Sequence, residues 1–135
     1  MKTRVWTVVL ALMLLQGAAA SQEPNEQAWC KNFGLAFHQI TSWREQGTTI
    51  KQSFEIMAQA HRQTAEGSTP MPQDAAQFYE TLMMGMVVHV YKHPMYRAFG
   101  PEMNRNRAQS RCERVGATNF MKEIDTETRI LVSQK

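Results

Sequence analysis

The chain contains two cysteines, Cys30 and Cys112, which lie 82 positions apart. Their state depends on the compartment, because disulfides persist outside the cytoplasm and are rare inside it. In an exported chain an even pair predicts one disulfide, and two reduced core cysteines are the alternative. Such a bridge would restrict the fold to arrangements in which segments near the two ends of the domain are neighbours.

Residues 1–20 have the pattern of a secretory signal peptide. Lys2 and Arg4 precede an apolar run from Val5 to Leu15, and the small residues before Ser21 form a cleavage site near Ala20-Ser21. The run is shorter than the roughly 18 residues that indicate a transmembrane helix, so a stable membrane anchor is the weaker interpretation. We therefore expect a soluble periplasmic or secreted protein.

The residues that follow the signal peptide are enough for one domain with a modest core. Removing Lys2 and Arg4 from the 15 basic residues leaves 13 of them against 12 acidic residues. With a net charge this close to zero, the chain as a whole is not expected to be attracted to nucleic acid or to an anionic membrane. We expect a helical domain over residues 21–116, followed by residues 117–135 as either a docked arm or a frayed tail.

Apolar residues recur at helical spacing in four segments, which predicts helices over residues 26–46, 50–66, 73–92 and 101–116. Gly47 can end the first helix, and Thr49 with Gln52 fits a capping box at the start of the second. Two prolines make residues 67–72 the clearest loop. A buried strand would also explain residues 87–91, but the unbroken stripe through Leu82, Met86 and His89 favours a helix.

These patterns predict an all-α fold. We expect a compact bundle of four helices, or five if the C-terminal segment is helical, with a disulfide from Cys30 in the first helix to Cys112 in the fourth. The short turn after the first helix predicts that the first two helices pack antiparallel. Arg44 ends the first helix, and we expect its guanidinium near the last carbonyls of that helix.

A group of methionines and two histidines lies between residues 83 and 95. On a helix Met86, His89 and His93 share a face, and thioether with imidazole donors suits Cu(I). Methionines on an apolar helix usually fill the core, however, and a core-facing histidine more often donates a hydrogen bond than binds metal. No metal and no other cofactor is therefore favoured, and these three residues are the candidate ligands of a copper-binding alternative.

Two groups of residues are candidates for contact with a protein partner. Arginines share a face of the fourth helix, where they either pair with acidic groups of a partner or are simply solvated. Large apolar side chains in the loop between Pro94 and Gly100 either form a partly exposed patch or cap the core. The candidates are Met95, Tyr96, Phe99, Arg107, Arg111 and Arg114.

The sequence does not favour catalysis. It has no G-x-S-x-G, no H-E-x-x-H and no Gly-rich phosphate loop. We expect a non-catalytic binding protein. An acid-stress chaperone of the periplasm is a further alternative, and it predicts partial unfolding below about pH 4 as carboxylates become protonated.

The layout of the chain resembles that of small exported helical proteins of Gram-negative bacteria, most of which have no assigned activity. The resemblance covers Trp29 to Gly116 and rests on Cys30, Arg44-x-x-Gly47-x-Thr49, Val90-Tyr91 and Cys112. In size and layout the chain is similar to the Tai-type immunity proteins, which bind and block toxic amidases delivered by type VI secretion. The resemblance implies an inhibitor of an envelope-targeting toxin, whose partner is another envelope or secreted protein, but it assigns no toxin-contact residue.

Overall fold

A computed structural model describes residues 26–66 and 73–134, and these residues form five α-helices and no strand. The helices are α2 (Glu26–Glu45), α3 (Ile50–Glu66), α4 (Gln73–Lys92), α5 (Pro101–Val115) and α6 (Ala117–Ser133). The all-α prediction is therefore confirmed, with five helices rather than four. The expected signal peptide and the expected loop over residues 67–72 lie outside the described residues. None of the helices in the described ranges is both long enough and apolar enough to cross a membrane.

The turn between α2 and α3 forms as its sequence predicts. Gly47 adopts a φ of +87°, a conformation that its lack of a Cβ makes accessible. The Thr49 hydroxyl accepts from the backbone N–H of Gln52 at 3.1 Å, and the Gln52 side chain accepts from the N–H of Thr49 at 2.9 Å. Both halves of the predicted capping box are present, and they start α3.

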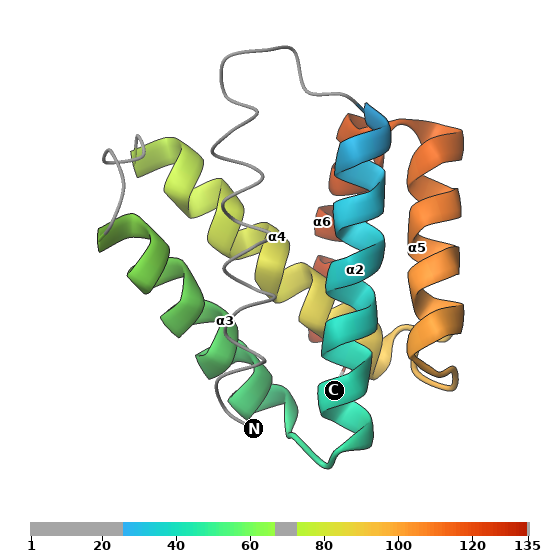
Figure 1. Cartoon of the computed structure of the whole chain (residues 1–135), viewed down its shortest axis with the longest axis horizontal. Helices are drawn as coiled ribbons and strands as arrows, with labels where there is room; N and C mark the ends of the chain where they lie inside the picture. Colours follow the sequence, from blue (N-terminus) through green and yellow to red (C-terminus); the bar gives the residue numbers. More distant parts are fainter. Residues whose placement is uncertain (1–25, 67–72, 135) are drawn as a thin grey trace.

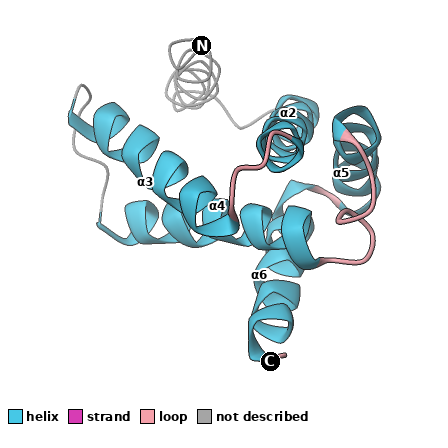
Figure 2. Ribbon diagram, turned by 90° about the horizontal axis from the view of Figure 1, so that it is seen from below, coloured by secondary structure: helices cyan, strands magenta, loops and turns pink. Residues whose placement is uncertain are grey.

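The helices form two side-by-side pairs, with α6 behind them (Figures 1 and 2). The most extensive contact joins α2 to α5, and α3 packs mainly on α4. The expected pairing of the first two helices is wrong, because α2 makes only a limited contact with α3. The turn is short, but the Cys30–Cys112 bridge and the close approach at Gly34 hold α2 against α5, while Phe33 of α2 packs on Phe120 of α6.

A disulfide joins α2 to α5. The sulfur atoms of Cys30 and Cys112 are 2.10 Å apart and both residues are buried, so the predicted bridge is present. One turn further along, a Cβ on Gly34 would lie 3.0 Å from the carbonyl oxygen of Arg105. The two helices can approach this closely because position 34 has no side chain.

The C-terminal segment is a helix that docks on α4. Gly116 separates it from α5 with a φ of +89°. Phe120 and Ile124, one turn apart, are both buried, and a Cβ on Gly85 of α4 would lie only 2.7 Å from Ile124 Cγ2. Of the two outcomes left open for residues 117–135, the structure shows the docked one for residues 117–133.

Aromatic rings and the apolar length of α4 make up the core. The ring centroids of Phe37 and Tyr96 are 4.7 Å apart, and those of Phe33 and Phe120 are 5.4 Å apart. Residues 82–90 of α4 are buried almost all round, as expected for a helix surrounded by others. The strand alternative for residues 87–91 is therefore excluded.

Candidate functional site

Arg44 holds the loop that follows α4. Its guanidinium donates to the carbonyl oxygens of Val90 at 2.6 Å, Tyr96 at 3.1 Å and Phe99 at 2.6 Å. Arg44 lies in the last turn of α2 as expected, but the expectation that its guanidinium would lie near the last carbonyls of that helix is wrong. The last carbonyls of α2 are already used, since they accept from the backbone N–H groups of residues 46–48. Arg44 instead satisfies the C-terminal end of α4 and fixes the course of residues 93–100.

Tyr91 adds a second connection between the same parts of the chain. Its hydroxyl donates to the carbonyl oxygen of Thr48 at 2.5 Å and lies 2.9 Å from the Ser53 hydroxyl. Arg44 and Tyr91 both belong to the pattern that resembles exported helical proteins. Both side chains make their hydrogen bonds within the chain.

The loop after α4 does not expose all three of its large apolar side chains. Met95 is 43% exposed, but Tyr96 is buried against Phe37, and Phe99 is half-buried beneath the guanidinium of Arg107 at 3.8 Å. Burial, with a smaller contribution from the negative charge of Glu127, raises the pKa of Tyr96 to about 12. Of the three loop candidates, Met95 alone offers a large exposed surface to a partner.

The three candidate arginines of α5 have different surroundings. Arg107 also donates to the carbonyl oxygen of Met95 at 3.0 Å. Arg111 makes two hydrogen bonds to Glu123 of α6, at 2.7 and 3.1 Å, and these bonds raise the pKa of Arg111. Arg114 is exposed, and no ion pair of Arg114 is found among the described residues. The proposed basic face is therefore reduced to Arg107 and Arg114.

These two arginines line a hollow beside the exposed methionine. It has a volume of about 280 Å³, and its lining residues are Met95, Asn106, Arg107, Ser110 and Arg114. Three of the five are residues that the sequence singles out. We call this the α5 hollow.

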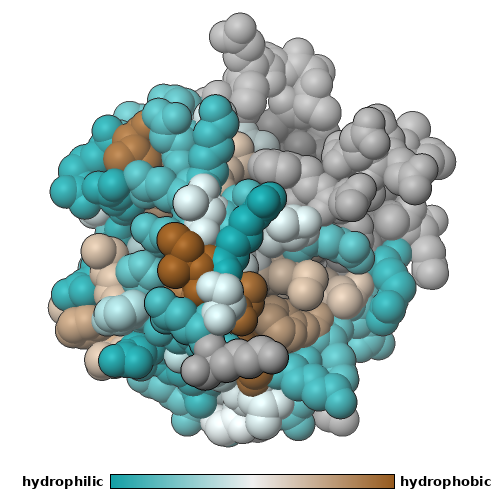
Figure 3. Space-filling model, turned by 180° about the vertical axis from the view of Figure 1, so that it is seen from behind, coloured by the Kyte–Doolittle hydropathy of each residue, from teal (hydrophilic) through white to brown (hydrophobic). Residues whose placement is uncertain are grey.

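Other large apolar side chains are exposed outside the α5 hollow. They are Met84, Met103, Ile130 and Val132. The back of the molecule shows apolar side chains near the middle of that face, with polar residues around them (Figure 3). Single exposed apolar residues are common on protein surfaces and carry no function by themselves.

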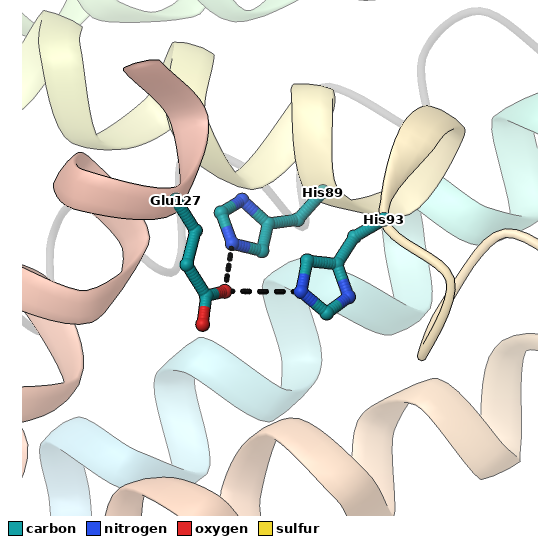
Figure 4. Close-up of side chains that lie close together, drawn as sticks. All are labelled: His89, His93 and Glu127. Atoms are coloured by element: carbon teal, nitrogen blue, oxygen red, sulfur yellow. Dashed lines mark hydrogen bonds and ion pairs between the residues drawn. The ribbon is translucent and has the colours of Figure 1, made fainter. Parts of the chain in front are cut away.

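A second group of candidate functional side chains lies where α6 packs against α4. His89 and His93 are one turn apart, and their rings are stacked with centroids 5.0 Å apart. Both rings point to the same carboxylate oxygen of Glu127 (Figure 4). Glu127 Oε2 lies 3.0 Å from Nε2 of His89 and 3.1 Å from Nε2 of His93. We call these three residues the His–Glu cluster.

The cluster differs from the ligand set that the sequence suggests. His89 and His93 do face the same point, but Met86 is buried in the core, and the third polar group is Glu127. Glu127 was not among the expected ligands, because the sequence pattern left residues 117–135 without an assigned structure. Glu127 lies three positions after the buried Ile124, so a helical assignment of this segment would have placed it beside α4.

Burial and charge act on the cluster together. Burial, helped by the neighbouring charge of His89, lowers the pKa of His93, while Glu127 acts in the opposite direction. The ring of His89 is 2% exposed and the side chain of Glu127 is 45% exposed. The cluster is therefore closed on the α4 side and open to solvent at Glu127.

Comparisons of the chain with models of known protein families, with curated proteins and with solved structures found no match. The α5 hollow, the His–Glu cluster and the sequence are therefore the features from which a function can be inferred.

Proposed function

We propose that the chain is an exported, non-catalytic binding protein whose partner is another protein of the cell envelope. The observation that carries this proposal is the α5 hollow, because it brings Met95, Arg107 and Arg114 together at the surface. Guanidinium groups make bidentate contacts to carboxylates, and a thioether adapts to varied apolar shapes. The hollow fits a segment of a partner that carries acidic residues next to an apolar side chain.

The hollow is partly ordered before any partner arrives. Arg107 is fixed between the ring of Phe99 and the carbonyl of Met95, so that binding costs less side-chain entropy than it would for a free arginine. A guanidinium has five N–H donors, and most of those on Arg107 remain for a carboxylate. The exposed Arg114 supplies a second positive charge, which favours encounter with an acidic surface.

Export is part of the same proposal. The signal-peptide pattern of residues 1–20 directs the chain to a compartment in which the Cys30–Cys112 bridge is stable. The resemblance to immunity proteins implies the more specific form of the function, in which the partner is a toxin that attacks the envelope and binding inhibits it.

Site-specific crosslinking in the periplasm of the native host tests the binding proposal. A photoreactive amino acid at position 110 lies in the hollow, and the same amino acid at position 118 lies on an exposed turn of α6 outside it. We expect one discrete adduct from position 110 and none from position 118. The Arg114→Glu variant should lose the adduct, and Arg62→Glu, at an exposed position on α3, should retain it.

Two results would contradict the proposal: the same adducts from both positions, or an adduct that survives Arg114→Glu. If the captured partner is an enzyme that cleaves the cell wall, and equimolar addition of this chain stops its activity, the inhibitor form is supported. A partner with no such activity leaves the binding function in place and excludes the immunity form.

A further inference from the structure

We propose that His89, His93 and Glu127 bind a divalent transition-metal ion, and that zinc fits their donors best. The two histidines come from the last turn of α4 and the residue after it, and Glu127 comes from α6. One donor atom from each residue lies within 4.8 Å of the others (Figure 4). The site lies at the α4–α6 contact and does not depend on the α5 hollow.

Hydrogen-bond partners fix the proton positions on His89. Its Nδ1 lies 2.8 Å from the carbonyl oxygen of Gly85, which can only accept, so Nδ1 carries a hydrogen. In the neutral ring Nε2 then presents a lone pair. That lone pair points at Glu127 Oε2, which is also an acceptor, across 3.0 Å. Two acceptors at this distance need a positive charge between them, either a proton or a metal ion.

His93 is arranged differently. Its Nδ1 accepts from the backbone N–H of Met95 at 3.1 Å, so its Nε2 carries the hydrogen and donates to Glu127. One oxygen of Glu127 thus faces two ring nitrogens, and only the nitrogen of His93 brings its own hydrogen in the neutral state. The unsatisfied pair is His89 and Glu127, and His89 is the buried member.

The donor types favour zinc over the Cu(I) that a methionine-containing set would suit. Two imidazole nitrogens and one carboxylate oxygen form a known zinc ligand set that leaves a fourth position open. Cu(I) prefers soft thioethers and thiolates. The hydrogen bond from His89 Nδ1 to a backbone carbonyl is also the outer contact that orients metal-binding histidines.

The distances require a modest rearrangement. Two donors that bind one zinc ion at roughly 2.1 Å with tetrahedral angles are about 3.4 Å apart. The nitrogen–oxygen distances here are 3.0 and 3.1 Å. His89 is fixed by its surroundings, whereas His93 and Glu127 are partly exposed and can close around an ion. His93 must move its hydrogen from Nε2 to Nδ1, which gives up the exposed contact with the N–H of Met95.

The open side of the cluster can supply the fourth ligand. Glu127 borders a shallow hollow of about 560 Å³ that is also lined by Val115, Asn119, Lys122, Glu123 and Thr126. Water can therefore reach Glu127, the ligand on the α6 side. Glu123 is held by Arg111 in this hollow and does not compete for the ion.

Zinc titration by calorimetry tests the proposal on the oxidised, tag-free protein after treatment with a chelator. We expect one zinc ion per chain and a melting temperature that rises with zinc concentration, because the ion binds the folded state. Glu127→Gln and His93→Gln should each weaken zinc binding by more than the 10- to 100-fold that loss of an outer hydrogen-bond partner costs. Cobalt bound in place of zinc should give the visible spectrum of a four-coordinate site.

The chain provides a matched control. His38 and Glu102 form a second histidine–glutamate pair, with Nε2 and Oε1 3.1 Å apart, on the α2–α5 side. Within the described part of the chain, no third residue lies where it could bind a metal ion together with this pair. Glu102→Gln should leave zinc affinity unchanged.

Three results would overturn the proposal: no saturable binding, equal binding in the wild type and Glu127→Gln, or equal loss in Glu102→Gln and Glu127→Gln. The first would mean that a proton occupies the His89–Glu127 contact and that the cluster is an ion pair only. If Glu127→Gln does not fold, as judged by circular dichroism, the partly exposed His93→Gln decides the question.

Discussion

The guanidinium of Arg44 donates to the carbonyl oxygen of Val90 at 2.6 Å, although 46 positions separate the two residues. The same guanidinium also holds the carbonyls of Tyr96 and Phe99. The loop between α4 and α5 is therefore fixed by a side chain from α2. Because this loop carries Met95 and His93, one arginine positions part of both the α5 hollow and the His–Glu cluster.

Replacing Arg44 should destabilise the protein strongly. In Arg44→Met three partly buried carbonyls lose a charged donor, and we expect the free energy of unfolding to fall by about 3 kcal/mol. Urea denaturation measures it. Arg129→Met is the control, because Arg129 is exposed and, within the described residues, forms an ion pair with Asp125 one turn away, so its loss should cost less than about 0.5 kcal/mol. Similar losses in both variants would show that the three carbonyl contacts do not matter.

Gly85→Ala should weaken the docking of α6. The new Cβ would lie 2.7 Å from Ile124 Cγ2 and 3.0 Å from Thr128 Oγ1, and overpacking of this kind costs about 1–3 kcal/mol. Alanine returns up to about 1 kcal/mol through helix propensity. We expect a net loss, measured by urea denaturation. Gly100→Ala, whose Cβ would make only an ordinary contact with Glu45, should be close to neutral, and a stabilised Gly85→Ala would contradict the close packing of α4 and α6.

Loss of the disulfide should lower stability by about 4 kcal/mol in the chain-entropy model, because the bridge closes a loop of 82 positions. The comparison is between the oxidised wild type and Cys30→Ala/Cys112→Ala, in denaturant without reductant. Adding reductant should destabilise the wild type and leave the double variant unchanged. A difference below about 1 kcal/mol would mean that the unfolded chain gains little freedom when the bridge is absent.

Tyr96 should make stability fall at alkaline pH. Its pKa is raised to about 12 in the folded protein, whereas an unfolded tyrosine titrates near 10. The unfolded state therefore loses the proton first, so the contribution is complete below about pH 10 and is lost as the pH rises to about 12. Urea denaturation at several pH values, with tyrosinate absorbance, measures it. Tyr96→Phe should remove this part of the pH dependence of the free energy of unfolding. An unchanged pH dependence in this variant would mean that another group causes the fall in stability.

Local signals in the sequence predicted most of the helices. The capping box at Thr49, the proline at position 101 and the glycines at 47 and 116 set helix ends to within a residue or so of those observed. The disulfide also followed from local information, because export and an even cysteine count were enough. Helix pairing did not, since it depends on which apolar faces meet, and the short α2–α3 turn gave the wrong pair.

The candidate site was predicted only in part. His89 and His93 share a face because their spacing is one helical turn, and that much is visible in the sequence. Glu127 is far away in the chain and joins them only through the α4–α6 contact. Similarly, Tyr96 and Arg111 were candidates for contact with a partner, but their side chains contact Phe37 and Glu123 of the same chain. No sequence pattern distinguishes an arginine paired within its own chain from one that is free.

The Cys30–Cys112 bridge makes residues 30–112 a covalent ring, and α6 is the one described helix that lies wholly outside it. The bridge therefore constrains α2 to α5 covalently, whereas α6, apart from the chain itself, is held to them by non-covalent contacts alone. Within the described residues α6 is attached to the ring by Phe120 against Phe33, Ile124 against Gly85, Glu123 with Arg111, and Glu127 with the two histidines. A metal ion bound by His89, His93 and Glu127 would add a further connection between α6 and the covalent ring.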